Sequence, residues 1–245
     1  MNEYIFLGIV QGIFEWIPVS SEGVVALLSQ FLIEDFRPVD LSLFLHLGTL
    51  FAVLVYFRKD WQEILMFKNL KLLKFLLLAT LISLAVGYPV YKIIKDLAVG
   101  SFLLMVMGLG LLITAYFNKT KRTFKISPNN LAIVTGFLQG FTVIPGLSRS
   151  GATIFGLSLG KDDPQEVLKI SYLMSAPVVL ASGIYLFLEN PSLAFEAWPA
   201  LIFSFLFGIL SLGFLLKITR SISFFKFALI FSCLCFLGAA TGFLI

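Results

Sequence analysis

The amino-acid sequence predicts an all-α polytopic membrane protein, with about six transmembrane helices and two re-entrant helical hairpins in an inverted-topology repeat. Two observations predict this fold class. Only 13% of the residues are charged and 59% are hydrophobic, whereas a soluble domain carries about 25% charged residues. The apolar residues also gather into long runs separated by short basic loops, as expected of a chain that crosses a membrane several times.

Six apolar stretches approach the length of about 20 residues that a helix needs to cross the hydrocarbon core. They are residues 41–57, 71–89, 98–117, 167–188, 197–216 and 226–245. We interpret residues 1–245 as a single membrane domain, in which repeat one covers about 1–117 and repeat two about 131–245.

Two further apolar segments, around 4–31 and 131–160, are interrupted midway by the sequences PVSSEG and PGLSRSG. Each half is too short to cross a membrane, and a broken backbone cannot face lipid with unsatisfied amide and carbonyl groups. We therefore expect both segments to be re-entrant hairpins that are buried in protein.

The two hairpins are similar in sequence, which indicates an internal repeat. Residues 8–23 (GIVQGIFEWIPVSSEG) and 136–151 (GFLQGFTVIPGLSRSG) share small or polar residues at one fixed offset, namely Gly8/Gly136, Gln11/Gln139, Gly12/Gly140, Ser20/Ser148 and Gly23/Gly151. Three predicted spans lie between the copies, so the second hairpin enters from the opposite side of the membrane. Basic residues favour this topology, because fourteen fall on the side of the 58–74 loop and only Arg37, Lys92 and Lys95 on the other.

Three ionisable residues fall at membrane depth within the hairpins: Glu15, Glu22 and Arg149. An unpaired charge there costs roughly 2.5–3.5 kcal/mol on insertion scales, so we expect a buried partner or a water-filled cavity. Gln11 and Glu15 are four residues apart and share one helix face. Ser20 and Ser21 follow in a turn whose amides and hydroxyls suit an anion.

The second hairpin offers a phosphate site by the same reasoning. Ser148, Arg149 and Ser150 precede an apolar run, and amides at a helix N-terminus bind phosphate oxygens. A guanidinium adds a planar, bidentate and permanently charged contact. Thr153, in the first turn beyond, adds a hydroxyl.

Other interpretations of these residues stay open at this point. Glu15 and Arg149 could form a purely structural ion pair. Serine and glycine in a turn often serve only the backbone conformation of the turn. Glu22 could lie in water at a cavity mouth. His46, the single histidine, could be a hydrogen-bonded packing residue, and one histidine cannot by itself make a metal site.

The two motifs resemble those of the undecaprenyl-diphosphate phosphatase family, also called the bacitracin-resistance family of membrane phosphatases. GIVQGIFEWIPVSSEG is similar to its first motif and IPGLSRSGATI to its second, while LHLGTLFAV and YLMSAPVVLASG look like further stretches of the family. The resemblance covers nearly the whole chain. One position departs from it, because many members carry a histidine, commonly proposed as catalytic, where this sequence has Val24.

The resemblance implies roles for the residues that match its motifs. Gln11 and Glu15 would be the residues of the acidic motif, and Ser20 and Ser21 would form the phosphate-facing turn. The diphosphate pocket would be lined by Ser148, Arg149, Ser150 and Thr153. It also implies a divalent cation, Mg²⁺ or Ca²⁺, and a site open to the extracytoplasmic face.

We therefore expect a multi-pass protein of the cell membrane that hydrolyses a polyprenyl diphosphate to the monophosphate lipid carrier, a recycling step in peptidoglycan and cell wall synthesis that is linked to bacitracin resistance. Arg149 would clamp the phosphates, and Glu15 would hold the metal or act as a base. Ser21 is the candidate nucleophile, and a metal-activated water is the alternative.

A polyprenyl-phosphate transporter or flippase is the second hypothesis, because inverted repeats with broken helices are typical of transporters. A membrane scaffold is the third. The expected partners are the lipid and the membrane, with a homodimer left open. Nucleic acid is not expected, because the basic residues fall between apolar runs, where they orient a membrane protein.

Overall fold

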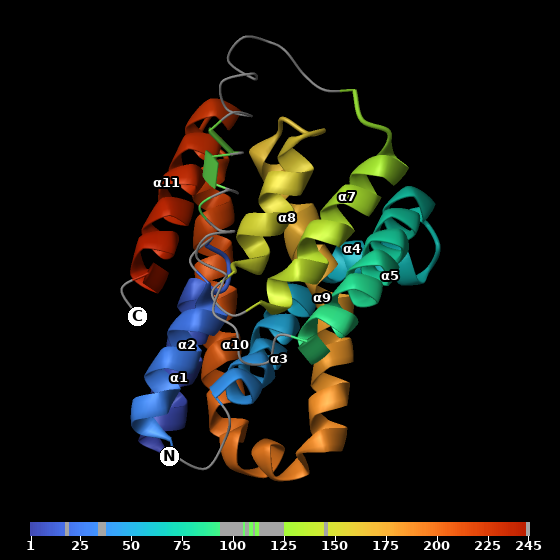
Figure 1. Cartoon of the computed structure of the whole chain (residues 1–245). Helices are drawn as coiled ribbons and strands as arrows, with labels where there is room; N and C mark the ends of the chain where they lie inside the picture. The colour runs from blue at the N-terminus through green and yellow to red at the C-terminus, as the bar shows by residue number, and fades with distance from the viewer. Residues whose placement is uncertain are drawn as a thin grey trace.

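The computed structural model is all helical over the residues that it describes, which are 1–17, 20–33, 38–93, 105, 108, 109, 111, 112, 125–144 and 147–243 (Figure 1). The first half contains α1 (Asn2–Phe14), α2 (Ser21–Leu32), α3 (Pro38–Tyr56), α4 (Arg58–Leu65) and α5 (Leu70–Ile93). The second half contains α7 (Pro128–Gly140), the 3₁₀ turn η1 (Phe141–Val143), α8 (Arg149–Ser158), α9 (Pro164–Glu189), α10 (Pro191–Thr219) and α11 (Phe224–Phe243).

Three of these helices, α5, α9 and α10, are long and apolar enough to cross a membrane. The helices α3 and α4 make a fourth candidate if the pair, bent by 81° around Phe57, is one span. A shorter apolar stretch, 225–240, lies in α11. The prediction of a multi-pass helical membrane protein is thus confirmed, whereas the span predicted at 98–117 falls mostly outside the described residues.

Both predicted helix interruptions are present. The chain leaves α1 after Phe14 and resumes helix at Ser21, and it leaves α7 and η1 before α8 begins at Arg149. Ser148 is the N-cap of α8, because its side chain accepts a hydrogen bond from the Gly151 amide at 3.2 Å, which satisfies one of the amides exposed at a helix start.

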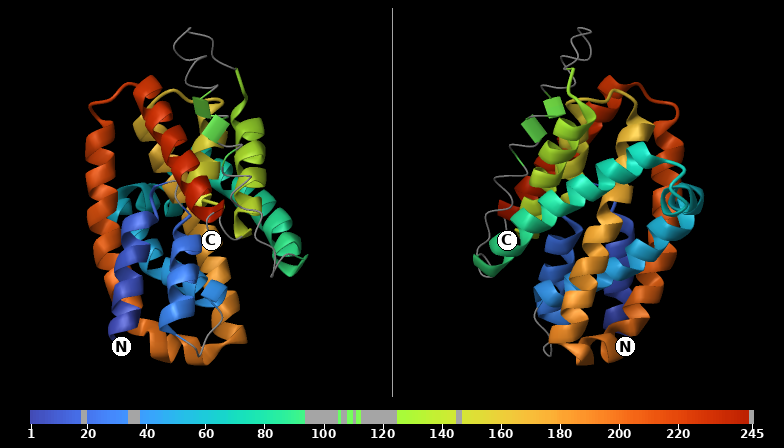
Figure 2. Two further views of the ribbon diagram at one scale, coloured as in Figure 1. Left: turned by 60° about the vertical axis from the view of Figure 1, so that its left-hand side comes forward. Right: turned by 90° about the vertical axis from the view of Figure 1, so that its right-hand side faces the viewer.

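The two interrupted helix pairs occupy opposite halves of the molecule. The N-terminus and the connection from α9 to α10 lie at one end, and the beginnings of α7 and α9 lie at the other (Figures 1 and 2). The pair of α1 and α2 lies in the half of the molecule that contains the N-terminus, and the pair of α7 and α8 lies in the half that contains the beginnings of α7 and α9. The breaks of the two pairs therefore meet in the middle.

Each pair is held by a helix of the other half at very close range. A Cβ added to Gly8 of α1 would collide with the carbonyl of Ala200 in α10, and one added to Gly136 of α7 would collide with the carbonyl of Ala79 in α5. Small residues permit such contacts between membrane helices. The two partner helices carry them at four-residue spacing, as Ala79, Ser83 and Gly87 in α5 and as Ala200, Ser204 and Gly208 in α10.

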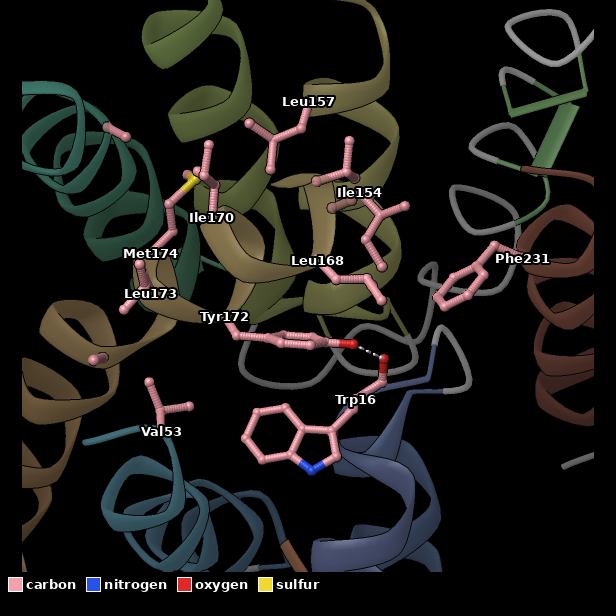
Figure 3. Close-up of a cluster of buried hydrophobic side chains, with 14 of the residues drawn as sticks. Trp16, Val53, Ile154, Leu157, Leu168, Ile170, Tyr172, Leu173, Met174 and Phe231 are labelled. Carbon is pink, nitrogen blue, oxygen red and sulfur yellow. Dashed lines mark hydrogen bonds between the residues drawn. The ribbon is translucent and has the colours of Figure 1, made fainter. Parts of the chain in front are cut away.

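Trp16 and Tyr172 fix the end of α1 against the second half of the chain. The Tyr172 hydroxyl of α9 donates a hydrogen bond to the Trp16 carbonyl at 3.0 Å (Figure 3), and the two rings meet edge to face with centroids 5.0 Å apart. The Trp16 indole donates to the Gly208 carbonyl of α10 at 2.8 Å. These contacts position the neighbouring residue, Glu15.

Candidate functional site

A polar cavity of about 20 Å³ lies where α1 ends and where α2 and α8 begin. A cavity of this size has room for about one water molecule. It is lined by Glu15, Ser20, Ser21, Glu22, His46, Leu147, Ser148, Arg149 and Ser150. The structure thus gathers the three membrane-depth ionisable residues and the two predicted serine clusters around one point.

The Glu15 carboxylate is the centre of this hydrogen-bonded cluster, and its side chain is only 1% exposed. Its Oε1 pairs with Arg149 Nη2. Its Oε2 accepts hydrogen bonds from Gln11 Nε2 at 2.6 Å and from Ser21 Oγ at 2.9 Å, and it lies 3.2 Å from His46 Nε2. The prediction that Gln11 and Glu15 share one helix face is confirmed, and both carboxylate oxygens have protein partners.

The Arg149 guanidinium is only partly paired. Its Nε and Nη1 are buried and have no hydrogen-bond partner among the described residues. A buried donor without a partner costs about 1–3 kcal/mol, and more when the group is charged. This side chain is therefore suited to take up additional acceptor oxygens at the cavity.

Two helix starts supply further donors to the same cavity. Ser21 is the first residue of α2 and Arg149 is the first residue of α8, so free amides and the positive ends of two helix dipoles meet there. Ser150 holds the arrangement together, because its hydroxyl donates to the Ile17 carbonyl at 2.9 Å and lies 3.0 Å from the Ser148 hydroxyl.

His46 of α3 is a cavity residue that sequence reasoning did not connect to Glu15. Its Nδ1 lies 2.8 Å from the Ser42 carbonyl oxygen, which can only accept, so Nδ1 carries a proton and Nε2 faces Glu15. No sequence pattern links residues 15 and 46, because the contact joins two different helices. Val24 does not line the cavity and instead packs against the buried apolar cluster that contains Val25.

Thr153 and Glu22 differ from the expectations that Thr153 lines the pocket and that Glu22 could lie in water at a cavity mouth. Thr153 is fully buried beside the cavity without lining it, and its hydroxyl donates to the Arg149 carbonyl at 2.9 Å and lies 2.6 Å from Ser171 Oγ. Thr153 therefore supports the first turn of α8. Glu22 lines the cavity, is only 7% exposed, and its Oε1 has no hydrogen-bond partner within the described part of the chain.

The side chains of the cavity fit a cation that is bound partly by protein oxygens and partly by substrate phosphates. They do not suit a site in which the protein supplies every ligand. Among the described residues, no group of three or more His, Cys, Asp or Glu side chains could hold a metal ion. Mg²⁺ is typically bound by one or two carboxylates together with substrate phosphates. In the described part of the chain, Glu22 Oε1 is a carboxylate oxygen of the lining without a hydrogen-bond partner, whereas both oxygens of Glu15 are engaged.

Comparison with known proteins yields full-length similarity. The sequence model of the family described as bacitracin resistance protein BacA matches residues 4–237. An undecaprenyl-diphosphatase of Methanococcoides burtonii is 33% identical over an alignment of 253 residues that covers 94% of each chain. One from Haloarcula marismortui is 33% identical over 93% of each chain. One from Thermosipho melanesiensis is 34% identical over 89% of this chain and 90% of the relative.

Proposed function

The chain belongs to the bacitracin resistance protein family, its function is that of an undecaprenyl-diphosphatase, and we propose that Glu15, Ser21 and Arg149 carry out the reaction at the polar cavity. The reaction hydrolyses undecaprenyl diphosphate to the monophosphate lipid carrier and inorganic phosphate. The membrane that holds the substrate is the plasma membrane, and the first hairpin opens to its extracytoplasmic face.

The unsatisfied guanidinium of Arg149 is the observation that carries this assignment. Phosphate oxygens would accept hydrogen bonds from the two buried nitrogens that have no partner among the described residues, Nε and Nη1, and bonds from a charged donor to a phosphate are strong ones. The amides at the starts of α2 and α8 would bind the remaining oxygens. Because the cavity of about 20 Å³ is too small for a diphosphate, the lining must move apart when the substrate binds.

Ser21 is the nucleophile that the geometry favours. Its hydroxyl already donates to Glu15 Oε2 at 2.9 Å, so Glu15 can accept the proton as Ser21 Oγ bonds to the terminal phosphorus. The bond from that phosphorus to the bridging oxygen breaks, and undecaprenyl monophosphate leaves. As it leaves, the monophosphate takes this proton from Glu15. Water then hydrolyses the phosphoserine: Glu15 takes a proton from the attacking water and returns it to Ser21 Oγ as the bond from Ser21 Oγ to phosphorus breaks. Arg149 stabilises the charge on the phosphoryl oxygens in both steps.

Gln11 and His46 are positioning residues in this scheme. Both contact Glu15 Oε2, and His46 is fixed in turn by the contact of its Nδ1 with the Ser42 carbonyl oxygen of its own helix. They hold the carboxylate in the orientation in which it faces the Ser21 hydroxyl.

We further propose that a divalent cation, Mg²⁺ or Ca²⁺, binds at Glu22 together with the substrate phosphates. When bound, the cation would neutralise phosphate charge. The buried Glu22 Oε1 without a partner among the described residues supports this assignment, and Glu15 lines the same cavity beside it.

The matched close contacts of Gly8 with Ala200 and of Gly136 with Ala79 support the six-span inverted-topology repeat. The glycines hold equivalent positions in the two sequence copies, and each packs on the small-residue face of a helix from the other half. A pseudo-two-fold relationship between the halves accounts for both contacts at once.

The test measures phosphate release from undecaprenyl diphosphate by purified protein in detergent, with and without Mg²⁺ or Ca²⁺. We expect Arg149→Lys to lower kcat/KM by about 10²-fold or more, because an ammonium keeps the charge but lacks the planar set of donors of a guanidinium. Arg220→Lys, at the exposed end of α10, is the matched control. Phosphate release that is equal in wild type and Arg149→Lys would reject the assignment of the site, and folded wild type that releases none would favour lipid transport.

A further inference from the structure

A second, larger cavity lies beside the polar one and has the opposite character. Its volume is about 320 Å³, and apolar atoms make up almost all of its lining. It is enclosed by α3, α5, α7 with η1, and α9, and its lining includes Leu43, Gly87, Tyr88, Val143, Ala181 and Tyr185. We refer to it as the apolar cavity.

Three serine and threonine side chains in its lining have hydroxyl groups that are bonded within the protein. Thr142 Oγ1 donates to the Gln139 carbonyl at 2.7 Å, and Ser182 Oγ donates to the Val179 carbonyl at 3.0 Å. Ser83 Oγ is engaged by Gln139 Nε2 at 3.3 Å. Since these hydroxyl groups have protein partners, the cavity presents mainly carbon to an occupant, as a hydrocarbon site does. Gln139 Oε1, in the same lining, is buried without a hydrogen-bond partner among the described residues.

The apolar cavity is a neighbour of the polar one along two elements. Leu43, which lines the apolar cavity, and His46, which lines the polar one, are three residues apart on one face of α3. Val143, in η1, lines the apolar cavity, and Leu147, four residues later, lines the polar one. A ligand that fills both cavities would therefore have its polar part against Arg149 and its apolar part beyond Leu43.

The apolar cavity leads away from the polar site towards the membrane. Ala181 and Tyr185 lie roughly 14 and 20 Å further along α9 than Tyr172, at about 1.5 Å per residue. Tyr88 of α5 is 51% exposed, and the rings of Tyr91 and Tyr185 meet at 6.0 Å between α5 and α9. Tyrosines at the ends of membrane helices mark the interface, and because Tyr88 also lines the cavity, the cavity reaches the exposed surface of α5 at Tyr88.

We propose that the apolar cavity binds the isoprene units next to the diphosphate of the substrate, and that the prenyl chain passes between α5 and α9 into the bilayer. This inference rests on the proposed function, because it takes the diphosphate to bind at Arg149. The chain is covalently joined to a headgroup held at the polar cavity, so its first units require an apolar path that begins there. The apolar cavity supplies that path.

The first test fills the cavity from α9. We expect Ala181→Trp to lower kcat/KM for undecaprenyl diphosphate by at least about tenfold, as when a group no longer fits its hydrophobic pocket. The inhibition constant of isopentenyl diphosphate, a competitor with the same diphosphate and a single isoprene unit, should change less than about twofold, since its headgroup site is intact. Leu180→Trp is the matched control, because Leu180 is 51% exposed on the neighbouring, lipid-facing side of α9.

The outcomes separate this inference from the proposed function. Equal losses for both ligands, or no loss for undecaprenyl diphosphate, would overturn the prenyl assignment while wild-type phosphate release still supports the reaction. Wild type that releases no phosphate would reject the reaction itself.

A second measurement does not depend on the folding of the tryptophan variant. In a chain that also carries Cys233→Ser, the thiol introduced by Ala181→Cys should react with a maleimide several-fold more slowly when undecaprenyl monophosphate is bound. Isopentenyl diphosphate, and a diacyl phospholipid at the same concentration, should give no such protection. Equal protection by the phospholipid would identify the cavity as a general lipid site and overturn the proposal.

Discussion

The guanidinium of Arg149 at the start of α8 pairs with the carboxylate of Glu15 at the end of α1, 134 residues earlier in the chain. This ion pair joins the breaks of the two interrupted helix pairs at the polar cavity. It also occupies part of the surface on which a phosphate would bind. The substrate therefore competes with Glu15 for Arg149. The two guanidinium nitrogens without a partner among the described residues lower the energy needed for that exchange.

Removal of one partner of the pair should destabilise the protein more than removal of both. Glu15→Gln leaves Arg149 buried without its counter-charge, which we expect to lower the free energy of unfolding by about 3–5 kcal/mol. The double variant Glu15→Gln with Arg149→Met should recover most of this loss and remain inactive. Unfolding in detergent, followed by helix content, measures the effect, and a double variant as unstable as the single one would contradict the reasoning.

Ser21→Ala should abolish turnover if the serine is the nucleophile. We expect a loss in kcat of at least about 10³-fold, as when a nucleophile is removed from a catalytic set. Rapid acid quenching of wild type should trap a phosphoserine that Ser21→Ala does not form, while Ser221→Ala, at the exposed end of α10, should behave as wild type. A Ser21→Ala variant that retains a tenth of the activity would assign the attack to water.

Glu22→Gln should weaken the binding of the divalent cation. Because an amide oxygen lacks the charge of a carboxylate, we expect the concentration of Mg²⁺ or Ca²⁺ needed for half activation to rise at least about tenfold. Direct binding by calorimetry gives a readout that is independent of turnover. Glu196→Gln, on an exposed position of α10, is the control, and unchanged metal binding in Glu22→Gln would remove Glu22 from the proposed site.

The close packing of α7 on α5 predicts opposite effects for two chemically identical substitutions. Gly136→Ala would drive its Cβ into the Ala79 carbonyl, so we expect a loss in stability of about 1–3 kcal/mol, as for overpacked cores. Gly213→Ala would place its Cβ 3.5 Å from the Tyr56 ring, an ordinary contact, and should be neutral or stabilising by up to about 1 kcal/mol. Thermal unfolding of the two variants side by side decides this, and equal midpoints would refute it.

The features that the sequence predicted are those with a local cause. Long apolar runs predict membrane helices because hydrophobicity and length are properties of a segment, and α5, α9 and α10 confirm this. The sequences PVSSEG and PGLSRSG predict helix breaks because proline, glycine and serine act on the backbone next to them. The shared face of Gln11 and Glu15 follows from helical periodicity alone, and their hydrogen bond bears it out.

Other features arise from contacts between segments that are distant in the chain. Four features depend on how separate helices pack. They are the position of His46 beside Glu15, the burial of Glu22, the support of α8 by Thr153 and Ser171, and the apolar cavity between α5 and α9. The small residues at Ala79 and Ala200 likewise acquire a role only when α7 and α1 lie against them. The sequence by itself determined the class of the fold, the breaks and the residue types of the site. The tertiary structure decided which of those residues meet, because burial and pairing at membrane depth are properties of the packed helices and not of any one segment.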